Sequence, residues 1–318
     1  MSAARVLVTR QFVSGGLDPL LAAGHEIVER SDDTPFTPTE LAAAVADVDA
    51  VVCALTDPFD AVVLRAGAAG RLRVVANVAV GYDNIDVVTA TELGIAVCNT
   101  PGVLDETTAD LAFLLLLAAA RRTSDAEADL RNGRWTGFRM GNFLGTDVHG
   151  RSLGIVGYGR IGQAVARRAA GFGMTVLHHT RHDTGVAGWT ADLDDLFRTS
   201  DAVTLHVPLT PDTFHLVDAQ RLALMPSHAV LVNTARGQVV DEVALADALE
   251  RGTIFGAGLD VFEHEPQVHP RLLAAPHAVL VPHIGSATEQ TRRAMTELAC
   301  SGVVAVLAGE RPPNLVTP

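Results

Sequence analysis

The sequence predicts an α/β protein with two domains, each built on a parallel sheet. At 318 residues the chain is longer than a single hydrophobic core usually supports. Short apolar segments typical of buried strands alternate with segments of helical spacing along most of its length. Such alternation is typical of a parallel sheet with helices on both faces. A polar, glycine-rich stretch that ends at Gly150 separates two series of these segments, which indicates a second domain.

The first series lies in the N-terminal third of the chain. A helix after a glycine-rich turn is expected at residues 17–23, and a second at residues 39–45, behind a Thr-Pro-Thr start signal. Apolar runs bounded by turn residues predict five strands, at residues 5–9, 27–29, 51–54, 74–77 and 95–98.

The second series follows a long helix expected at residues 105–122. Acidic residues at its start and Arg121 and Arg122 at its end complement the helix dipole. A last helix is expected at residues 288–307. Between Gly150 and this helix we expect six strands, at residues 152–156, 175–178, 202–206, 229–233, 256–260 and 278–281.

The composition of the chain argues against nucleic-acid and membrane partners. The formal net charge of -13 argues against nucleic-acid binding, which needs a concentrated excess of basic side chains. The longest apolar run, residues 111–120, is too short to cross a bilayer, and the N-terminus lacks the apolar region of a signal peptide. Cys53, Cys98 and Cys300 lie far apart in apolar surroundings, which predicts buried thiols in a reducing compartment. We therefore expect a cytoplasmic protein with no membrane or nucleic-acid partner.

A glycine-rich loop follows the expected strand at residues 152–156. It reads Gly157-Tyr-Gly159-Arg-Ile-Gly162 and leads directly into a helical pattern. A lone GxGxxG motif is weak, but a strand before it and a helix and a second strand after it are typical of dinucleotide binding. Gly157 would allow the tight turn, Gly159 the approach of a pyrophosphate, and Gly162 the packing of the helix on the sheet. The helix N-terminus would hold the phosphates.

The residue that would contact the adenosine ribose is expected about 20 residues after the loop, at the end of the next strand. A carboxylate there would favour NAD, but the sequence has Thr180 at this position, with Arg181 beside it. An uncharged residue next to a guanidinium suits the 2′-phosphate of NADP. We expect NADP to be preferred; NAD stays possible, because Asp183 lies just beyond and is the main alternative acid. Three nearby histidines lack Cys or acidic partners at the usual spacing, so no metal site is predicted.

Several segments resemble the D-isomer-specific 2-hydroxyacid dehydrogenases, and within them the glyoxylate/hydroxypyruvate reductases. The resemblance covers nearly the whole chain, and several motifs in the family's order are more specific than any one of them. The segments are residues 77–86, the glycine-rich loop, and residues 206–210, 231–238, 258–266 and 282–288.

This resemblance implies two Rossmann-like or flavodoxin-like domains with the active site in the cleft between them. The substrate-binding domain would be residues 1–100 plus 288–318, and the dinucleotide-binding domain residues 101–287. The helices at 105–122 and 288–307 would link the two. The resemblance also implies a homodimer, with a dimerisation arm at about residues 104–150. Trp135 resembles an aromatic residue that, in related reductases, lies in this arm and reaches the active site of the neighbouring subunit. The alternative is a surface or interface tryptophan that does not contact substrate.

The resemblance also assigns a catalytic set. Arg236 would hold the substrate carboxylate and polarise the keto oxygen, a task that suits the planar fork of a guanidinium. His283 would be the general acid for keto-acid reduction and the base for the reverse reaction, because histidine titrates near neutrality. Glu265 would be its hydrogen-bonded partner, although Glu263 is close enough to leave the register open. Asp260 would assist the cofactor or the histidine, or serve the structure alone.

Two further groups of residues follow from the resemblance. Backbone N–H groups of the loop after the strand at 74–77 would bind the substrate carboxylate, with Val78, Ala79, Val80 and Gly81 as candidates, together with Arg236 and His283. The cofactor-binding residues would be Gly157, Gly159, Arg160, Ile161, Gly162, Thr180, Arg181, Val207, Pro208, Thr213, Thr234, Ala235, Asp260, His283 and Gly285.

The expected function is therefore NAD(P)H-dependent reduction of a small 2-keto acid, of the glyoxylate or hydroxypyruvate type, to the D-2-hydroxy acid. Two other functions are compatible with the same sequence features. One is a dehydrogenase of the same fold for another substrate, a bulkier D-2-hydroxy acid or phosphite. The other is a non-catalytic corepressor that senses the dinucleotide, since such regulators can retain the same three residues.

Overall fold

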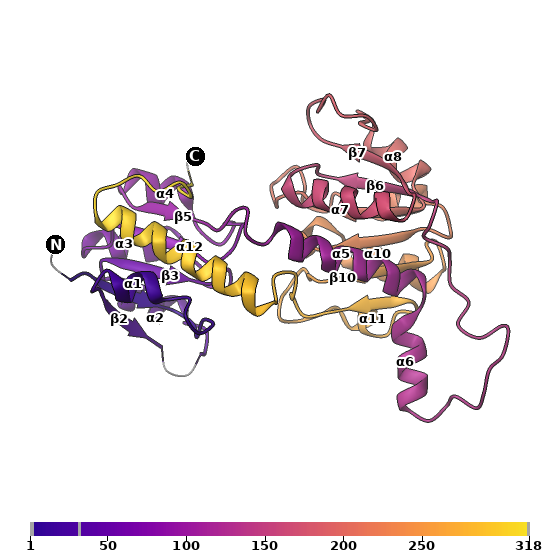
Figure 1. Cartoon of the computed structure of the whole chain (residues 1–318), viewed down its shortest axis with the longest axis horizontal. Helices are drawn as coiled ribbons and strands as arrows, with labels where there is room; N and C mark the ends of the chain where they lie inside the picture. The colour runs from indigo at the N-terminus through magenta and orange to yellow at the C-terminus, as the bar shows by residue number, and fades with distance from the viewer. Residues whose placement is uncertain (1–2, 31–32, 317–318) are drawn as a thin grey trace. The chain divides into compact units, whose positions relative to one another are not determined.

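The computed structural model of the chain describes residues 3–30 and 33–316. Its contacts divide the chain into two compact units. The first unit comprises Met1–Leu104 and Ser286–Pro318, and the second comprises Asp105–Gly285. Figure 1 shows the elements of each unit.

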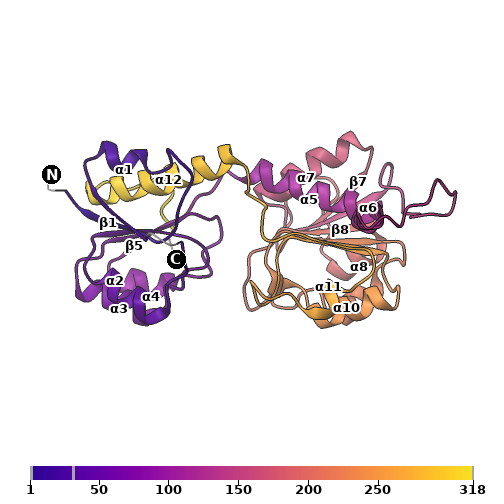
Figure 2. The same ribbon diagram turned by 90° about the horizontal axis from the view of Figure 1, so that it is seen from below.

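The first unit is a five-stranded parallel sheet in the order β2-β1-β3-β4-β5. In Figure 2, α1 and α12 cover one face of this sheet, and α2, α3 and α4 cover the other. Apolar side chains of α12 pack with those of the sheet in one core cluster, and a second cluster fills the opposite face. The elements are β1 (Arg5–Val8), α1 (Asp18–Ala22), β2 (Glu26–Glu29), α2 (Pro38–Val45), β3 (Ala50–Cys53), α3 (Ala61–Ala69), β4 (Val74–Asn77), α4 (Val87–Glu92), β5 (Ala96–Cys98) and α12 (Glu289–Leu307).

The second unit is a six-stranded parallel sheet in the order β11-β10-β9-β8-β6-β7. Figure 2 shows α5 and α7 on one face and α8, α10 and α11 on the other. The elements are α5 (Asp105–Ala120), α6 (Thr123–Arg131), β6 (Ser152–Val156), α7 (Arg160–Gly171), β7 (Thr175–His179), α8 (Leu193–Thr199), β8 (Ala202–Leu205), α9 (Ala219–Leu224), β9 (Val230–Asn233), η1 (Gly237–Val239), α10 (Glu242–Glu250), β10 (Gly256–Leu259), α11 (Pro270–Leu273) and β11 (Ala278–Leu280).

Both sheets contain a topological switch point, where consecutive connections leave a strand in opposite directions. In the first unit it lies between β1 and β3, and in the second between β6 and β8. Ligands of open α/β sheets bind beyond the carboxyl ends of the strands at such points. The predicted α/β fold class with two parallel-sheet domains is confirmed.

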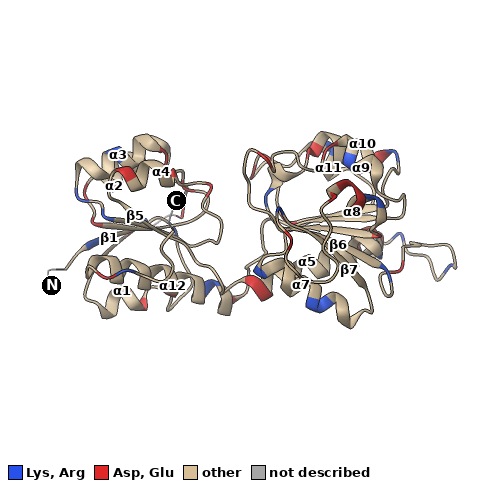
Figure 3. Ribbon diagram, turned by 90° about the horizontal axis from the view of Figure 1, so that it is seen from above, with Lys and Arg blue, Asp and Glu red and all other residues tan. Residues whose placement is uncertain are grey.

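The strands are nearly free of charge. Within the described strands, charged residues occur only in β1 and β2, as Arg5, Glu26 and Glu29. Figure 3 shows the acidic and basic residues mainly on helices and loops. Parallel strands covered on both faces must be apolar in this way, and this is why their apolar runs could be recognised in the sequence. The three cysteines are buried and unpaired, as predicted.

The ends of several predicted elements shift by one residue, and one predicted helix ends two residues earlier. The helix expected at residues 105–122 ends at Ala120, because Arg122 adopts a left-handed conformation (φ 53°) and α6 begins at Thr123. Arg121 and Arg122 therefore lie in a turn between two helices. No helix among the described residues is long and apolar enough to span a membrane.

Candidate active site

The glycine-rich loop connects β6 to α7. Gly157 has a φ of 91°, and a Cβ there would lie 2.5 Å from the backbone oxygen of His206 on the neighbouring strand's connection. A Cβ at Gly162 would overlap the backbone oxygen of Gly157, so this position needs glycine for packing. At Gly159, by contrast, a Cβ would meet nothing within 4 Å, and no side chain caps the helix that starts there. The open space beside uncapped N–H groups fits a bound pyrophosphate.

The turn after β7 holds the residues expected to select the cofactor. The Thr180 hydroxyl donates to the backbone oxygen of His182 (2.6 Å), and the Trp189 indole donates to the backbone oxygen of Thr180 (3.4 Å). Arg181 is exposed. The Asp183 carboxylate accepts from the N–H of Gly185 (2.8 Å), so it is engaged within its own turn.

His178, one residue before the end of β7, is fully buried and stacks on Tyr158 of the glycine-rich loop, with ring centroids 3.8 Å apart. Burial lowers its pKa, although the charge of Asp183 acts in the opposite direction. Its Nε2 lies 2.8 Å from the hydroxyl of Thr184. The stack therefore joins the glycine-rich loop to the strand that precedes Thr180. No group of His, Cys, Asp and Glu within the described ranges could hold a metal ion.

Arg236 lies just beyond the carboxyl end of β9. Asn233 at the strand end shapes this loop, because its amide donates to the backbone oxygen of Arg236 (2.8 Å) and its oxygen accepts from the N–H of Ala235 (3.0 Å). The guanidinium donates to the backbone oxygen of Ala235 (2.8 Å) and is half-buried. The hydroxyl of Thr234 is buried and finds no hydrogen-bond partner among the described residues. A buried polar atom without a partner at this strand end fits a ligand that is bound there.

His283 and Glu265 form a pair in the same unit. The Nδ1 atom of His283 lies 2.9 Å from Oε2 of Glu265, while Oε1 of Glu265 accepts from the N–H of Phe262 (3.0 Å). Burial raises the pKa of the Glu265 carboxyl, but the hydrogen bond and charge of His283 and the charge of Arg236 outweigh burial and bring it below its ordinary value. Glu263 is paired with His215 instead, so the alternative register is not the one found.

Asp260, at the end of β10, contacts the segment that carries His283. Its carboxylate accepts from the N–H groups of Ile284 (2.6 Å) and Gly285 (2.8 Å). Burial raises the pKa of Asp260 to about 6, although these two hydrogen bonds and the charge of His283 lower it. The residue therefore fixes the backbone around His283 and is an acid that titrates close to neutrality.

The loop of residues 78–81 belongs to the first unit. Its carbonyl groups accept hydrogen bonds: Ala79 from the N–H of Thr100 (2.8 Å), Val80 from the Asn99 amide (2.8 Å) and Gly81 from the Asn77 amide (2.8 Å). The N–H groups of Ala79, Val80 and Gly81 have no acceptor within the described part of the chain. Backbone N–H groups that find no acceptor among the described residues suit an anionic ligand.

The asparagines that hold this loop received no role in the sequence-based prediction. The Asn77 amide also lies 3.1 Å from Oδ1 of Asn84, and Asn84 donates to the backbone oxygen of Asp57 (2.9 Å). Asp57 is fully buried and paired with Arg10, whose Nη2 lies 2.5 Å from Oδ1 of Asp57. Asn77 and Asn84 fall within the segment that carries the family resemblance, and this was the available signal.

Among the remaining predicted cofactor residues, Arg160 and Ile161 begin α7, and the others follow the ends of β8, β9, β10 and β11. The Thr213 hydroxyl donates to the backbone oxygen of Pro208 (2.7 Å) and closes the loop after β8. Val207 lies against Gly157, where an added Cβ would come within 3.0 Å of its side chain. All of these residues, with Arg236, Glu265 and His283, belong to the second unit.

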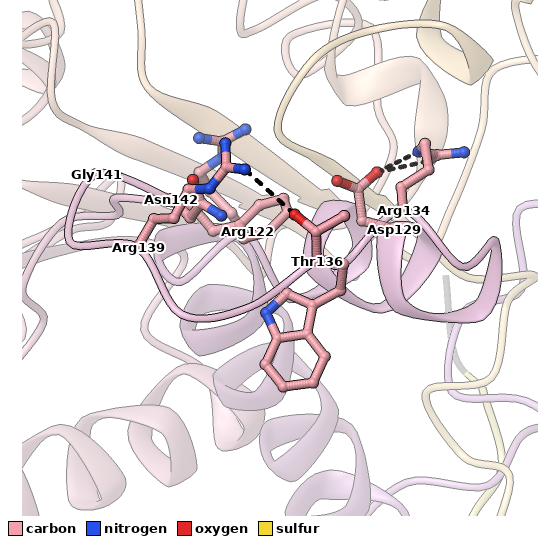
Figure 4. Close-up of a pocket in the computed structure, with 9 residues that line it drawn as sticks. Arg122, Asp129, Arg134, Thr136, Arg139, Gly141 and Asn142 are labelled. Atoms are coloured by element: carbon pink, nitrogen blue, oxygen red, sulfur yellow. Dashed lines mark hydrogen bonds and ion pairs between the residues drawn. The ribbon is translucent and has the colours of Figure 1, made fainter.

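A separate cavity lies in the arm between α6 and β6. Its volume is about 350 Å³. Figure 4 shows Arg122, Arg139 and Asn142 on one side and the Asp129–Arg134 pair on the other. Its arginines already have partners, since Arg134 pairs with Asp129 (2.6 Å), Arg122 with Asp125 (3.0 Å) and Arg139 donates to Thr136 (3.2 Å). None of the predicted catalytic residues lines this cavity.

Comparison with known families identifies the chain. Residues 113–285 match the model of the NAD binding domain of the D-isomer specific 2-hydroxyacid dehydrogenases. The chain belongs to this family. The resemblance noted in the sequence is thereby confirmed.

Relatives in the family match over almost the full length. The chain is 46% identical to a glyoxylate reductase of Thermococcus onnurineus over 98% of this chain and 95% of that protein. It is 48% identical to a glyoxylate reductase of Korarchaeum cryptofilum, with the same coverage. Among solved structures, a Thermus thermophilus protein has a TM-score of 0.92 at 44% identity, covering 98% of this chain and 100% of that one. The NADPH-dependent glyoxylate/hydroxypyruvate reductase of Sinorhizobium meliloti, in complex with NADP and malonate, has a TM-score of 0.87 at 37% identity, covering 99% and 97%.

Proposed function

We propose that the chain reduces a small 2-keto acid, of the glyoxylate or hydroxypyruvate type, to the D-2-hydroxy acid with NADPH as the preferred cofactor. The observation that carries the proposal is the Glu265–His283 pair in the same unit as Arg236 and the glycine-rich loop. The relatives named glyoxylate reductase support the substrate class. In this proposal the second unit binds the dinucleotide, and the first binds the substrate through the loop at residues 78–81.

The residues divide the chemistry as follows. A bound nicotinamide would supply the hydride that C2 of the keto acid receives. Arg236 would hold the carboxylate and polarise the keto oxygen with its fork of donors. The N–H groups of Ala79, Val80 and Gly81 would bind the same carboxylate. Glu265 accepts from Nδ1 of His283 and so orients the imidazole ring, which leaves Nε2 to deliver a proton to the C2 oxygen. In the reverse direction the neutral imidazole would accept that proton.

The preference for NADPH rests on the turn after β7. No carboxylate stands at the strand end, where Thr180 uses its hydroxyl within the turn, and the exposed Arg181 can meet a 2′-phosphate. Asp183, the alternative acid, is engaged by Gly185. NADP bound to the Sinorhizobium meliloti enzyme supports this assignment.

We also propose a homodimer formed through the arm at residues 104–150. Trp135, Phe138, Met140 and Leu144 are exposed there, at 57%, 84%, 83% and 64%. A cluster of exposed large apolar side chains on a protein of this size indicates an interface. Sedimentation at micromolar concentration should give twice the 33.4 kDa mass of the chain, and a monomer would refute the dimer.

The test of the activity follows the loss of absorbance of NADPH and NADH in parallel, with glyoxylate and with hydroxypyruvate. Rapid oxidation that prefers NADPH is expected. Rapid oxidation that prefers NADH would keep the reaction and overturn the assignment of Thr180 and Arg181. If neither cofactor is oxidised, the substrate class is wrong. Bulkier keto acids and, with NAD(P)+, phosphite would then be assayed, and inactivity with all of them would favour the non-catalytic corepressor.

A further inference from the structure

The loop that carries Arg236 and the loop that carries Glu265 are in direct backbone contact. A Cβ at Gly237 would overlap the carbonyl group of Phe262 and the nitrogen of Glu263. Gly237 follows Arg236, and Phe262 donates its N–H to Oε1 of Glu265 (3.0 Å). Any change in the spacing of these two loops therefore moves Arg236 relative to the acid that holds His283.

Hydrogen bonds to Glu263 hold the loop of Arg236 against the loop of Glu265. Its backbone oxygen accepts from the side-chain amide of Gln238 (2.8 Å), and its N–H donates to Oε1 of Glu242 (2.8 Å). Its carboxylate accepts a short hydrogen bond from Nε2 of His215. His215 in turn donates its own N–H to the backbone oxygen of Gln238 (2.8 Å). Two segments that are distant from Glu263 in the sequence, around His215 and at residues 238–242, thus converge on it.

The polar groups at this point are poorly exposed. The side chain of Glu263 is 14% exposed, and Glu242 is 5% exposed. The ring of Phe214 stacks on His215 with centroids 4.1 Å apart and covers one face of the imidazole, and the side chain of His215 is 34% exposed. Removing a carboxylate from water is costly even when it is paired, and an apolar cluster would stabilise the fold at least as well. The polar contacts instead make the position of the loop specific. Hydrogen bonds are directional and hold a loop in one position, whereas apolar packing allows several.

We propose that Glu263, held by His215, Gln238 and Glu242, is a positioning residue that fixes the Glu265–His283 pair relative to Arg236. The inference rests on the proposed roles of those three residues. Only His264 separates Glu263 from Glu265, and the N–H of Gln267 donates to the backbone oxygen of His264 (2.8 Å), which closes a tight turn around Glu265. A displacement of Glu263 is therefore transmitted to the Glu265 carboxylate.

The test compares three variants with a matched control. Glu263→Ala removes the side-chain contact, Glu263→Gln keeps an oxygen that can accept from His215, and Gln238→Ala removes one donor without changing charge. His228→Ala is the control, since His228 forms a comparable pair with Asp201 (2.6 Å) elsewhere in the unit. We expect kcat to fall about tenfold or more in Glu263→Ala, because small misplacements of reacting groups are costly. Glu263→Gln should retain more activity, and KM for NADPH should stay within about twofold in all variants because the glycine-rich loop is untouched.

A pH profile separates positioning from general loss of structure. In Gln238→Ala a looser Glu265–His283 hydrogen bond raises the pKa of Glu265, so the acid limb of kcat should move to higher pH. The charged groups that act on Glu265 are His283, Arg236 and Asp260, and this variant alters none of them. Unchanged kcat and an unchanged acid limb in Glu263→Ala and Gln238→Ala would overturn the proposal.

A measurement that does not depend on catalytic activity tests this inference separately from the proposed function. The proton between Nδ1 of His283 and Glu265 should give a downfield proton resonance, assigned by its loss in His283→Asn. In Glu263→Ala we expect it to move upfield or broaden, while in His228→Ala it stays. If this occurs in a protein that reduces no keto acid, the proposed function fails and the positioning role stands. If the resonance and the activity both equal those of the wild type, the positioning role fails alone.

Discussion

Asp260 holds the segment that begins at His283 with both its backbone oxygen and its carboxylate. The N–H of His283 donates to the backbone oxygen of Asp260 (2.8 Å), and the Asp260 carboxylate accepts from the next two N–H groups, of Ile284 and Gly285. His283 itself has a φ of 53°, a conformation that non-glycine residues adopt only where their surroundings hold them. The end of β10 therefore sets the backbone from which His283 projects.

The first prediction concerns this carboxylate and pH. Because burial raises the pKa of Asp260 from 3.8 to about 6, the folded protein binds more protons than the unfolded chain between these values. The stabilising contribution of Asp260 is thus complete below about pH 4 and is lost as the pH rises through 6. Asp260→Asn removes this contribution. The Tm advantage of the wild type over the variant should decrease as the pH rises from 4 to 6. If the Tm advantage grew with pH instead, the hydrogen bonds from the two N–H groups would outweigh burial and lower the pKa of Asp260.

The second prediction concerns His283. His283→Ala should lower kcat about 1,000-fold, because general acid catalysis contributes on the order of 10²- to 10⁴-fold. The affinity for NADPH, measured by fluorescence titration, should change little, since the glycine-rich loop and the turn at Thr180 are intact. The variant His228→Ala serves as the control and should keep wild-type activity. Retained turnover in His283→Ala would refute the catalytic assignment.

The pattern of residues predicted the strands and the glycine-rich loop, because each has a local physical signature. Buried parallel strands must be apolar, and the turn from β6 to α7 needs glycine at Gly157 and Gly162. The helix α6 has no such signature: its residues are polar and none is buried, so no apolar stripe marks it. The dipole preference of Arg121 and Arg122 predicts a longer α5 than the structure has, because the backbone turns at Arg122.

Contacts between residues that are distant in the sequence could not be predicted from local sequence patterns. His215 and Glu263 are 48 residues apart, and Thr9 and Asp57 also 48, with no periodicity that joins them. The choice between Glu263 and Glu265 as the partner of His283 depended on such contacts, because two glutamates two residues apart satisfy the same local pattern. The asparagines that hold residues 78–81 were likewise visible only once the strands had brought Asn77, Asn84 and Asn99 together.

The third prediction concerns cofactor choice. The double variant Thr180→Asp with Arg181→Ala places a carboxylate at the end of β7 and removes the guanidinium beside it. The ratio of kcat/KM for NADPH to that for NADH should fall about 100-fold, since a charge-assisted hydrogen bond contributes about 1.5–3 kcal/mol and the carboxylate adds repulsion. Arg198→Ala, at an exposed arginine of α8, is the control for lost positive charge. An unchanged ratio would mean that other residues select the cofactor.

The last prediction concerns the buried ion pair behind the loop at residues 78–81. Asp57 is fully buried and accepts from Arg10 (2.5 Å), from the Thr9 hydroxyl (2.6 Å) and from the N–H of Ala54 (3.0 Å). Asp57→Ala would leave Arg10 buried without its carboxylate, which typically costs about 3–5 kcal/mol. The free energy of unfolding in urea should fall by about that amount. Glu127→Ala, which breaks the exposed pair with Arg131, should cost at most about 0.5 kcal/mol.

The same variant tests whether the ion pair supports the substrate loop. Asn84 donates to the backbone oxygen of Asp57 and contacts Asn77, which holds Gly81, so a disturbed segment around Asp57 displaces the N–H groups proposed to bind the carboxylate. At a temperature where Asp57→Ala remains folded, KM for the keto acid should rise while KM for NADPH stays constant, because only the first unit is perturbed. A loss of stability with unchanged KM would restrict the pair to a structural role, whereas a rise in both KM values would indicate that the effect spreads to the dinucleotide-binding residues.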